Sequence, residues 1–133
     1  MPTMPARIIH TSIERDWRDV ARFVLDPENM AQWAAGLGAG FERKGDHWAV
    51  DGGPIGEIEV RFAPGNDLGV ADHEVTMPDG TRVHNALRVV PNGDGAEVMF
   101  TLLRQPGMSD TDFEADADHV RKDLAKLKSI LEG

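Results

Sequence analysis

Hydrophobic and polar side chains alternate through most of the middle of the chain. Six short segments have apolar residues at every second position, and turn sequences rich in Gly, Pro, Asn and Asp separate them. A period of two is typical of strands with one buried and one solvated face, and short turns favour antiparallel neighbours. The pattern therefore predicts a meander of antiparallel strands. These strands are expected at residues 39–44, 47–51, 56–63, 69–77, 81–90 and 96–104.

The chain before this meander follows two other patterns. Residues 7–13 are short and β-branched, which predicts a strand. Residues 16–25 have apolar side chains at helical spacing, which predicts an amphipathic helix. Asp26 is a good N-cap, and the proline after it is tolerated in a first helical turn. A second short helix is therefore predicted to carry Trp33 and to end near Gly36.

The last part of the chain predicts a long helix that crosses the sheet. Thr111 to Glu114 (T-D-F-E) matches a capping box, in which Thr111 would cap the helix and Glu114 would bond back to it. Apolar residues then recur at spacings of three and four, which gives the helix one apolar stripe. The stripe consists of Phe113, Ala117, Val120, Leu124, Leu127 and Leu131. Two short helices are too small to cover this stripe, so we expect it to lie against the sheet.

Composition narrows the class of protein. The chain has 133 residues, which fits one domain spanning residues 1–133. It has no cysteine, which excludes a disulfide scaffold, a thiolate zinc site, an iron–sulfur centre and a cysteine nucleophile. With 14 Lys and Arg against 23 Asp and Glu, the net charge is −9. We therefore expect no binding to nucleic acid or to anionic membrane surfaces.

The sequence has no pattern typical of a targeting or membrane segment. No apolar run approaches the roughly 20 residues of a membrane span. The first residues lack the basic and apolar regions of a signal peptide. We expect no membrane insertion, and because the absence of cysteine fits a reducing compartment, we expect a cytoplasmic location.

Two stretches near the N-terminus resemble a known family. Residues 11–14 (T-S-I-E) and 20–33 (VARFVLDPENMAQW) resemble the opening of the START-like, polyketide cyclase/dehydrase (SRPBCC) superfamily. In that superfamily a strand runs into a helix and then into a D-P-E-N-(L/M)-x-x-W segment, and the order of predicted elements is similar from about residue 6 to residue 131. The resemblance implies an α+β helix-grip fold. A curved antiparallel sheet of about seven strands would wrap around a long C-terminal helix, with two short helices after the first strand.

The resemblance also implies a deep cavity between the sheet and the long helix. Members of the superfamily include lipid carriers, plant hormone receptors, aromatic polyketide cyclases and activators of a chaperone ATPase, so the fold alone does not fix the function. The matching segment, Asp26 to Trp33, would set the start of a helix and pack an indole near one end of the cavity. The expected partner is a small hydrophobic or aromatic molecule.

The inward parity of each predicted strand, together with the helix stripe, gives the candidate ligand-binding residues. Apolar side chains fix the parity, because Val75 and Leu87 must face the core. The candidates are Trp33, Phe41, Trp48, Val60, Phe62, His73, Asn85, Leu87, Phe100, Phe113, Ala117 and Val120.

His73 and Asn85 are the polar residues expected to face the core from two neighbouring strands. Buried polar groups need partners, and a ligand oxygen, a buried water or each other would serve. Burial would keep His73 neutral at pH 7. A one-residue bulge in either strand would instead turn its residue outward.

No metal, cofactor or nucleophile is expected. Asp72, His73 and Glu74 are consecutive, so their side chains point to opposite faces of a strand. His84 falls on the opposite parity to His73, so no set of three ligands forms. None of the serines stands at a spacing from a histidine that indicates a triad.

Three functional classes follow from the sequence, and we favour the first. The first is a non-catalytic binding or carrier protein for a small hydrophobic or aromatic ligand. The alternative is a cyclase- or dehydratase-like enzyme, with His73 as general base and Asn85 stabilising an enolate oxygen. A weaker alternative is a protein-interaction module that uses the outer sheet surface and resembles the chaperone ATPase activators.

Overall fold

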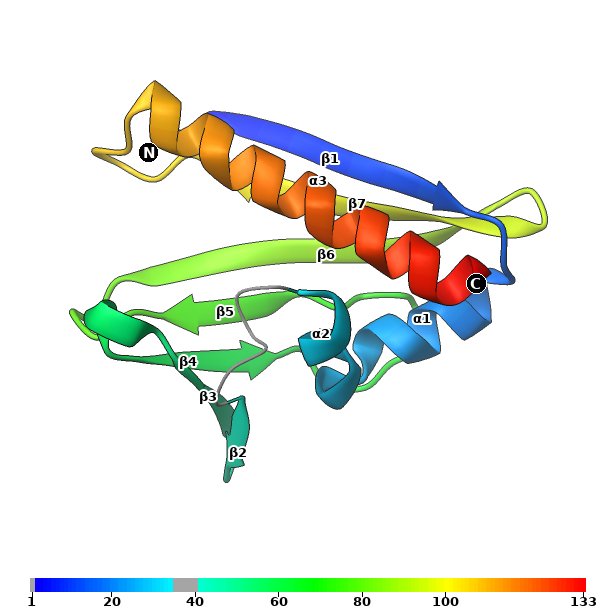
Figure 1. Cartoon of the computed structure of the whole chain (residues 1–133), viewed down its shortest axis with the longest axis horizontal. Coiled ribbons are helices and arrows are strands. Elements are labelled where there is room, and N and C mark those ends of the chain that lie inside the picture. Colours follow the sequence, from blue (N-terminus) through cyan, green and yellow to red (C-terminus); the bar gives the residue numbers. More distant parts are fainter. Residues whose placement is uncertain (1, 35–40) are drawn as a thin grey trace.

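A computed structural model describes residues 2–34 and 41–133, and it has the expected helix-grip α+β architecture (Figure 1). An antiparallel seven-stranded sheet and three helices lie in the described part of the chain. The elements are β1 (Ala6–Ile13), α1 (Trp17–Leu25), α2 (Pro27–Trp33), β2 (Glu42–Lys44), β3 (His47–Asp51), the 3₁₀ turn η2 (Gly53–Ile55), β4 (Glu57–Phe62), β5 (His73–Thr76), β6 (Arg82–Asn92), β7 (Gly95–Leu103) and α3 (Asp110–Glu132).

The strands from β2 to β7 form the predicted meander. Each pairs with the next in an antiparallel register, and β1 returns to pair with β7, which gives the order β1-β7-β6-β5-β4-β3-β2. Helix α3 runs along β1 and β7 on the face of the sheet that the helices cover (Figure 1). The C-terminal end of α3 lies beside α1, and α2 lies over the other part of the sheet.

The two short helices begin where the sequence predicts. The Asp16 carboxylate accepts a hydrogen bond from the Arg18 amide at 2.9 Å, which caps α1. The Asp26 carboxylate accepts one from the Glu28 amide at 3.0 Å, which caps α2 directly after α1 ends. One side-chain acceptor at each start thus satisfies amides that have no partner inside the helix. The predicted end of α2 near Gly36 and the first residues of the strand at 39–44 lie outside the described residues.

The predicted capping box at the start of α3 is wrong. The cap is Ser109, whose Oγ accepts a hydrogen bond from the Asp112 amide at 3.1 Å. Glu114 bonds instead to Arg7 of β1, with 2.6 Å between Oε1 and Nη2. An acid three residues after a threonine fits the sequence pattern of a capping box, but a cation on a neighbouring strand competes for it.

The apolar stripe of α3 lies against the sheet, as predicted. Phe113, Ala117, Leu124, Leu127 and Leu131 are buried, and Val120 is half-buried. The stripe joins one core cluster with α1 and the inner faces of β1, β6 and β7. Within this cluster the largest side chains with less than 2% exposure are Ile13, Val20, Val24, Met30, Leu87, Val89, Val98, Leu124 and Leu127.

The strand predicted at residues 69–77 is shorter than expected, because the regular strand covers only His73–Thr76. The Asp72 carboxylate accepts a hydrogen bond from the Leu87 amide at 2.9 Å. In a regular β-ladder a backbone carbonyl would accept this hydrogen bond. Gly69 has a φ of +75°, and a Cβ atom there would lie 2.0 Å from the Val89 carbonyl oxygen. Only glycine allows this close approach between the segment and β6.

Candidate functional site

Two adjoining chambers lie between the inner face of the sheet and the helices. The small chamber has a volume of about 200 Å³ and the large chamber one of about 660 Å³. Val75, Asn85, Phe100 and Val120 line both, so they form the junction. The small chamber is lined by Met30, Trp33, Ala34, Val60, His73, Val75, Asn85, Leu87, Phe100, Val120, Asp123 and Leu124. The large chamber is lined by Ile55, Val75, Met77, Pro78, Asp79, Thr81, Val83, Asn85, Phe100, Leu102, Leu103, Gln105, Met108, Asp116, His119 and Val120.

More than half of the sequence-predicted ligand residues meet at the small chamber. They come from α2, four strands and α3, which explains why no short sequence motif marks the site. These residues are Trp33, Val60, His73, Asn85, Leu87, Phe100 and Val120. The structure therefore brings together residues separated by up to 87 positions in the chain.

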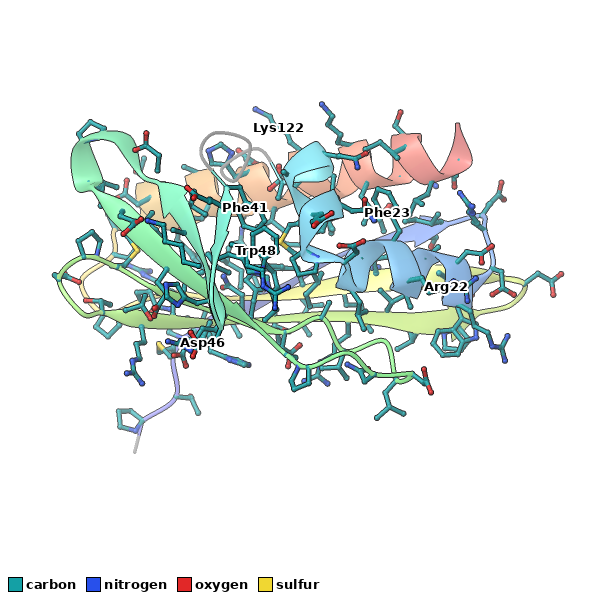
Figure 2. All side chains as sticks on the ribbon, turned by 90° about the horizontal axis from the view of Figure 1, so that it is seen from below. Arg22, Phe23, Phe41, Asp46, Trp48 and Lys122 are labelled. Atoms are coloured by element: carbon teal, nitrogen blue, oxygen red, sulfur yellow. The ribbon has the colours of Figure 1, made fainter. Side chains whose placement is uncertain are left out.

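Phe41, Trp48 and Phe62 lie outside the chamber lining, contrary to the predicted pocket wall. The rings of Phe41 and Trp48 stack with centroids 4.5 Å apart, and Phe62 meets Phe41 edge-on at 6.3 Å. Figure 2 shows Phe41 and Trp48 lying together between the sheet and the helices. Phe62 also contacts His73, with centroids 5.6 Å apart. Aromatic pairs of this geometry are favourable, and these rings therefore pack on one another and support His73 from the side.

Phe113 and Ala117 also lie outside the lining. The Arg7 guanidinium stands 5.1 Å from the centroid of the Phe113 ring, so this ring packs beneath β1. Ala117 has no exposed surface and belongs to the core cluster. The part of the helix stripe near β1 is thus filled by protein, and Val120 is the stripe residue that reaches the chamber junction.

Sequence reasoning missed several lining residues on α3. Asp116, His119 and Asp123 follow the helical spacing of three and four, on one side of the apolar stripe. Their position beside the stripe is the signal that could have found them. Burial raises the pKa of Asp116 above its ordinary value. Met77 ends the predicted strand 69–77 on the same parity as Val75, and that parity is the signal that could have found it. Met108 comes from a loop, where periodicity has no meaning.

His73 and Asn85 face the chambers, and they lie directly opposite each other in the register of β5 and β6. The Nδ1 atom of His73 lies 3.2 Å from the Ala71 carbonyl oxygen. Because a carbonyl can only accept, Nδ1 carries the proton and Nε2 is an acceptor. The Asn85 amide nitrogen lies 3.4 Å from that Nε2 and donates to it. The predicted inward parity of both residues is confirmed.

Burial lowers the pKa of His73, as expected for an imidazole with 9% of its surface exposed. The hydrogen bond to Ala71 and the charge of Asp72 act in the opposite direction and are weaker. His73 therefore stays neutral at pH 7, with one fixed acceptor nitrogen on the chamber side.

The indole nitrogen of Trp33 is another buried polar atom at this site. Trp33 ends α2 with 5% of its surface exposed, and it lines the small chamber. No acceptor within the described residues reaches its Nε1. Buried polar groups without partners are rare in native proteins.

The outer face of the sheet at the same level is occupied by an ion-pair cluster. The Arg88 guanidinium binds Asp72 with 2.7 Å between Nη2 and Oδ2, and His84 Nε2 lies 3.7 Å from the same carboxylate. The Arg88 hydrogen bond lowers the pKa of Asp72. His84 lies on the face opposite to His73, as predicted, and Arg88 is exposed beside it. Among the described residues no group of three or more His, Asp or Glu side chains could hold a metal ion.

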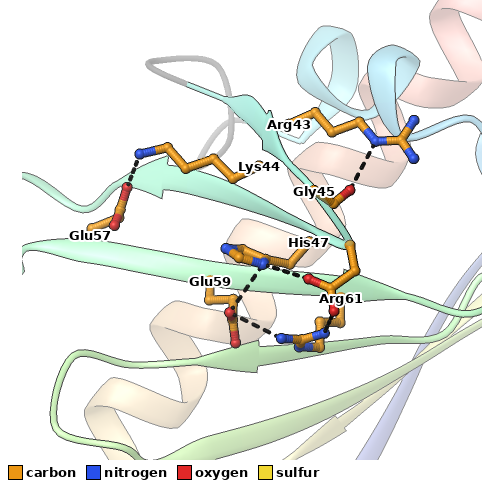
Figure 3. Close-up of polar contacts among 8 residues, drawn as sticks. Arg43, Lys44, Gly45, His47, Glu57, Glu59 and Arg61 are labelled. Carbon is orange, nitrogen blue, oxygen red and sulfur yellow. Dashed lines mark hydrogen bonds and ion pairs between the residues drawn. The ribbon is translucent and has the colours of Figure 1, made fainter.

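A second outer cluster lies where β3 and β4 meet the turn after β2 (Figure 3). His47 and Arg61 both hydrogen bond to Asp46 and lower its pKa to about 2. Arg61 and His47 also reach Glu59. Asp46 and Arg61 are exposed and His47 and Glu59 are half-buried, and ion pairs that solvent reaches contribute little to stability. This cluster forms a solvated surface on the face opposite the chambers.

The fold and the chambers define a helix-grip protein with a cavity that is open to solvent. Neither a protein-family model nor a curated protein matches the sequence. Solved structures do match: DynU16, from the dynemicin biosynthetic locus, has a TM-score of 0.72 and 16% identity, and the alignment covers 96% of this chain. It covers 47% of DynU16, so the chain spans about half the length of that protein.

Two further neighbours align over most of their own length. CalU16 from Micromonospora echinospora has a TM-score of 0.70 and 16% identity, with 99% of this chain and 80% of CalU16 covered. Ara h 8.0201 has a TM-score of 0.63 and 8% identity, with 96% of this chain and 97% of that one covered. At such identities the likeness establishes a common fold, which is the helix-grip α+β fold. No helix among residues 2–34 and 41–133 is long and apolar enough to cross a bilayer.

Proposed function

We propose that this protein binds a small hydrophobic or aromatic molecule in the two chambers between the sheet and α3. The observation that carries the proposal is the pair of adjoining chambers, whose walls are mostly aliphatic, aromatic or methionine side chains. Ligand sites are typically concave and apolar, with a few polar groups that orient the ligand. His73 and Asn85 are two such groups at the small chamber. The common fold with DynU16, a protein of a biosynthetic locus, supports a small-molecule ligand.

Binding of N-phenyl-1-naphthylamine, an uncharged fluorescent probe, tests this proposal. The probe should bind the wild type with enhanced emission, and Val120→Phe should weaken binding at least tenfold by filling the chamber junction. Ile8→Phe is the matched control, because Ile8 lies on β1 with 62% of its surface exposed. The proposal is wrong if Val120→Phe folds and binds the probe as well as Ile8→Phe does. Native mass spectrometry of the protein as expressed would identify a co-purified ligand.

A cyclase- or dehydratase-like reaction is a second candidate, and the His73–Asn85 pair favours it. The Nε2 atom of His73 is unprotonated, and a substrate that replaces the Asn85 hydrogen bond there would reach its lone pair, as a general base requires. The Asn85 amide, released from Nε2, would then stabilise an enolate oxygen. If a co-purified compound is converted by the wild type, His73→Ala should reduce turnover by about 10²–10⁴-fold and leave its binding nearly intact. A pure binding protein returns the compound unchanged.

A further inference from the structure

The junction of the two chambers has one polar side chain with hydrogen-bonding capacity to spare. Asn85 makes one side-chain hydrogen bond within the described residues, from its amide nitrogen to His73 Nε2 at 3.4 Å. Its Oδ1 and its second N–H are then left for a ligand, because a primary amide offers two donors and an acceptor. Asn85 lines both chambers, so a ligand that spans them passes this amide.

The charged groups around the chambers are of one sign. Asp79, Asp116 and Asp123 line them, and no Lys or Arg does so among the described residues. His119 lines the large chamber, and His73, at the small chamber, is buried and neutral.

A carboxylate in these chambers would lose part of its hydration without gaining a cationic partner among the described residues. Burial of an unpaired anion is strongly unfavourable, and the three aspartates add repulsion when they are ionised. A carbonyl or hydroxyl group, in contrast, carries no charge and can bond to the spare N–H or Oδ1 of Asn85. The spare hydrogen-bonding groups of Asn85 and the lack of a cation in the described lining therefore both favour an uncharged ligand that carries an oxygen atom.

We infer that the chambers select uncharged apolar compounds carrying a carbonyl or hydroxyl oxygen, which Asn85 binds, and that they reject carboxylates such as fatty acids. This inference rests on the proposed function, because it assigns the class of ligand to the same two chambers. It predicts that the protein binds neutral compounds more tightly than carboxylates. It also predicts that a ligand oxygen adds the affinity of one hydrogen bond to Asn85.

Three naphthalenes of similar shape test the inference by displacement of N-phenyl-1-naphthylamine. They are 2-acetylnaphthalene, a ketone; 2-isopropenylnaphthalene, in which a methylene replaces the ketone oxygen; and 2-naphthoate, a carboxylate. Asn85→Leu should weaken ketone binding by about three- to tenfold relative to the hydrocarbon, which is the scale of one hydrogen bond. The carboxylate should bind the wild type at least tenfold more weakly than the ketone at pH 7.5. The double variant Asp116→Asn, Asp123→Asn should narrow that gap.

The outcomes separate this inference from the proposed function. If none of the three compounds displaces the probe and the probe itself does not bind, the proposed function fails. If all three bind, and Asn85→Leu leaves the ketone-to-hydrocarbon ratio unchanged or the carboxylate binds as tightly as the ketone, only the inference is overturned. If Asn85→Leu does not fold, the Asn85 side-chain amide signals of the wild type replace it. They should shift with the ketone and stay in place with the hydrocarbon, and the reverse result contradicts the inference.

Discussion

Strand β6 passes through two regions of the molecule that differ in packing. In the packed end, Val89 is fully buried in the cluster that includes Val20 and Val24 of α1. Leu87 marks the border, because it is fully buried and also lines the small chamber. In the hollow end, Val83 and Asn85 are half-buried and line the chambers. One strand, with one alternating pattern, thus serves as core and as cavity wall.

The difference comes from what lies above the strand. Helix α1 packs on β6 and β7 and supplies side chains that complete the packed end. At the hollow end α3 supplies Val120 and, beside it, Asp116 and Asp123, whose carboxylates do not fill an apolar space. The site therefore lies where helix side chains do not fill the space above the sheet. No sequence motif marks this position. Three predictions test this contrast between the packed end and the hollow end.

The largest expected effect is a difference in stability between two identical substitutions on β6. Val89→Ala should lower the free energy of unfolding by about 2–3 kcal/mol, because it removes buried methyl groups and leaves a void. Val83→Ala should cost less than about 1 kcal/mol, because that side chain already borders a chamber. Chemical denaturation of the two variants measures both values. Equal losses would show that the two ends of β6 are packed alike, and the contrast would be wrong.

The packed end was largely predictable from sequence, and the irregular segment before β5 was not. Strict alternation along β6 and β7 and the helical stripe of α3 leave a single arrangement that buries Leu87, Val98 and Leu127. The break at residues 69–72 depends on a carboxylate of Asp72 that replaces a backbone acceptor. Strand propensity does not predict that a side-chain carboxylate will replace a backbone carbonyl as acceptor. An aspartate at this position is equally compatible with the solvated face of a regular strand.

For the candidate site, the sequence predicted which face of the sheet each residue lies on, but not which residues of that face line the chambers. Alternation placed His73 and Asn85 inside correctly, since a one-residue shift would have exposed Val75 and Leu87. The same alternation also placed Phe41 and Trp48 in the pocket wall, whereas their rings stack on each other. Parity gives the face of a sheet, but the division of that face between core and cavity depends on side-chain partners from distant segments.

The second prediction concerns pH and tests whether the hollow end is dry near His73. Burial lowers the folded-state pKa of His73 below the ordinary value of 6.5. The unfolded chain therefore takes up the proton first, so stability is complete above pH 6.5 and is lost as the pH falls from there toward the folded pKa. The loss is at most about 1.4 kcal/mol per pH unit for one proton. Unfolding free energies between pH 7.5 and 5.5 measure it.

Two variants identify the source of this pH dependence. His73→Gln should flatten the decline, because no titrating group remains at that position. Ile8→Ala is the control, since Ile8 is exposed on β1 and has no titrating side chain, and it should keep the slope of the wild type. A wild-type decline that His73→Gln leaves unchanged would show that His73 is hydrated and that the chamber next to it holds water.

The smallest expected effect concerns the N-cap of α3, which follows Met108 of the large-chamber lining. Ser109→Ala should lower the unfolding free energy by about 1 kcal/mol, because the Asp112 amide loses its acceptor at 3.1 Å. Thr111→Ala is the matched control and should have an effect close to zero, because the Thr111 side chain is exposed and makes no hydrogen bond within the described residues. Hydrogen exchange offers a local measurement: the Asp112 amide should exchange faster in Ser109→Ala and at the wild-type rate in Thr111→Ala. The opposite ranking would restore the capping box at Thr111. It would also mean that α3 begins two residues later and leaves the chamber wall near Met108 to the preceding loop.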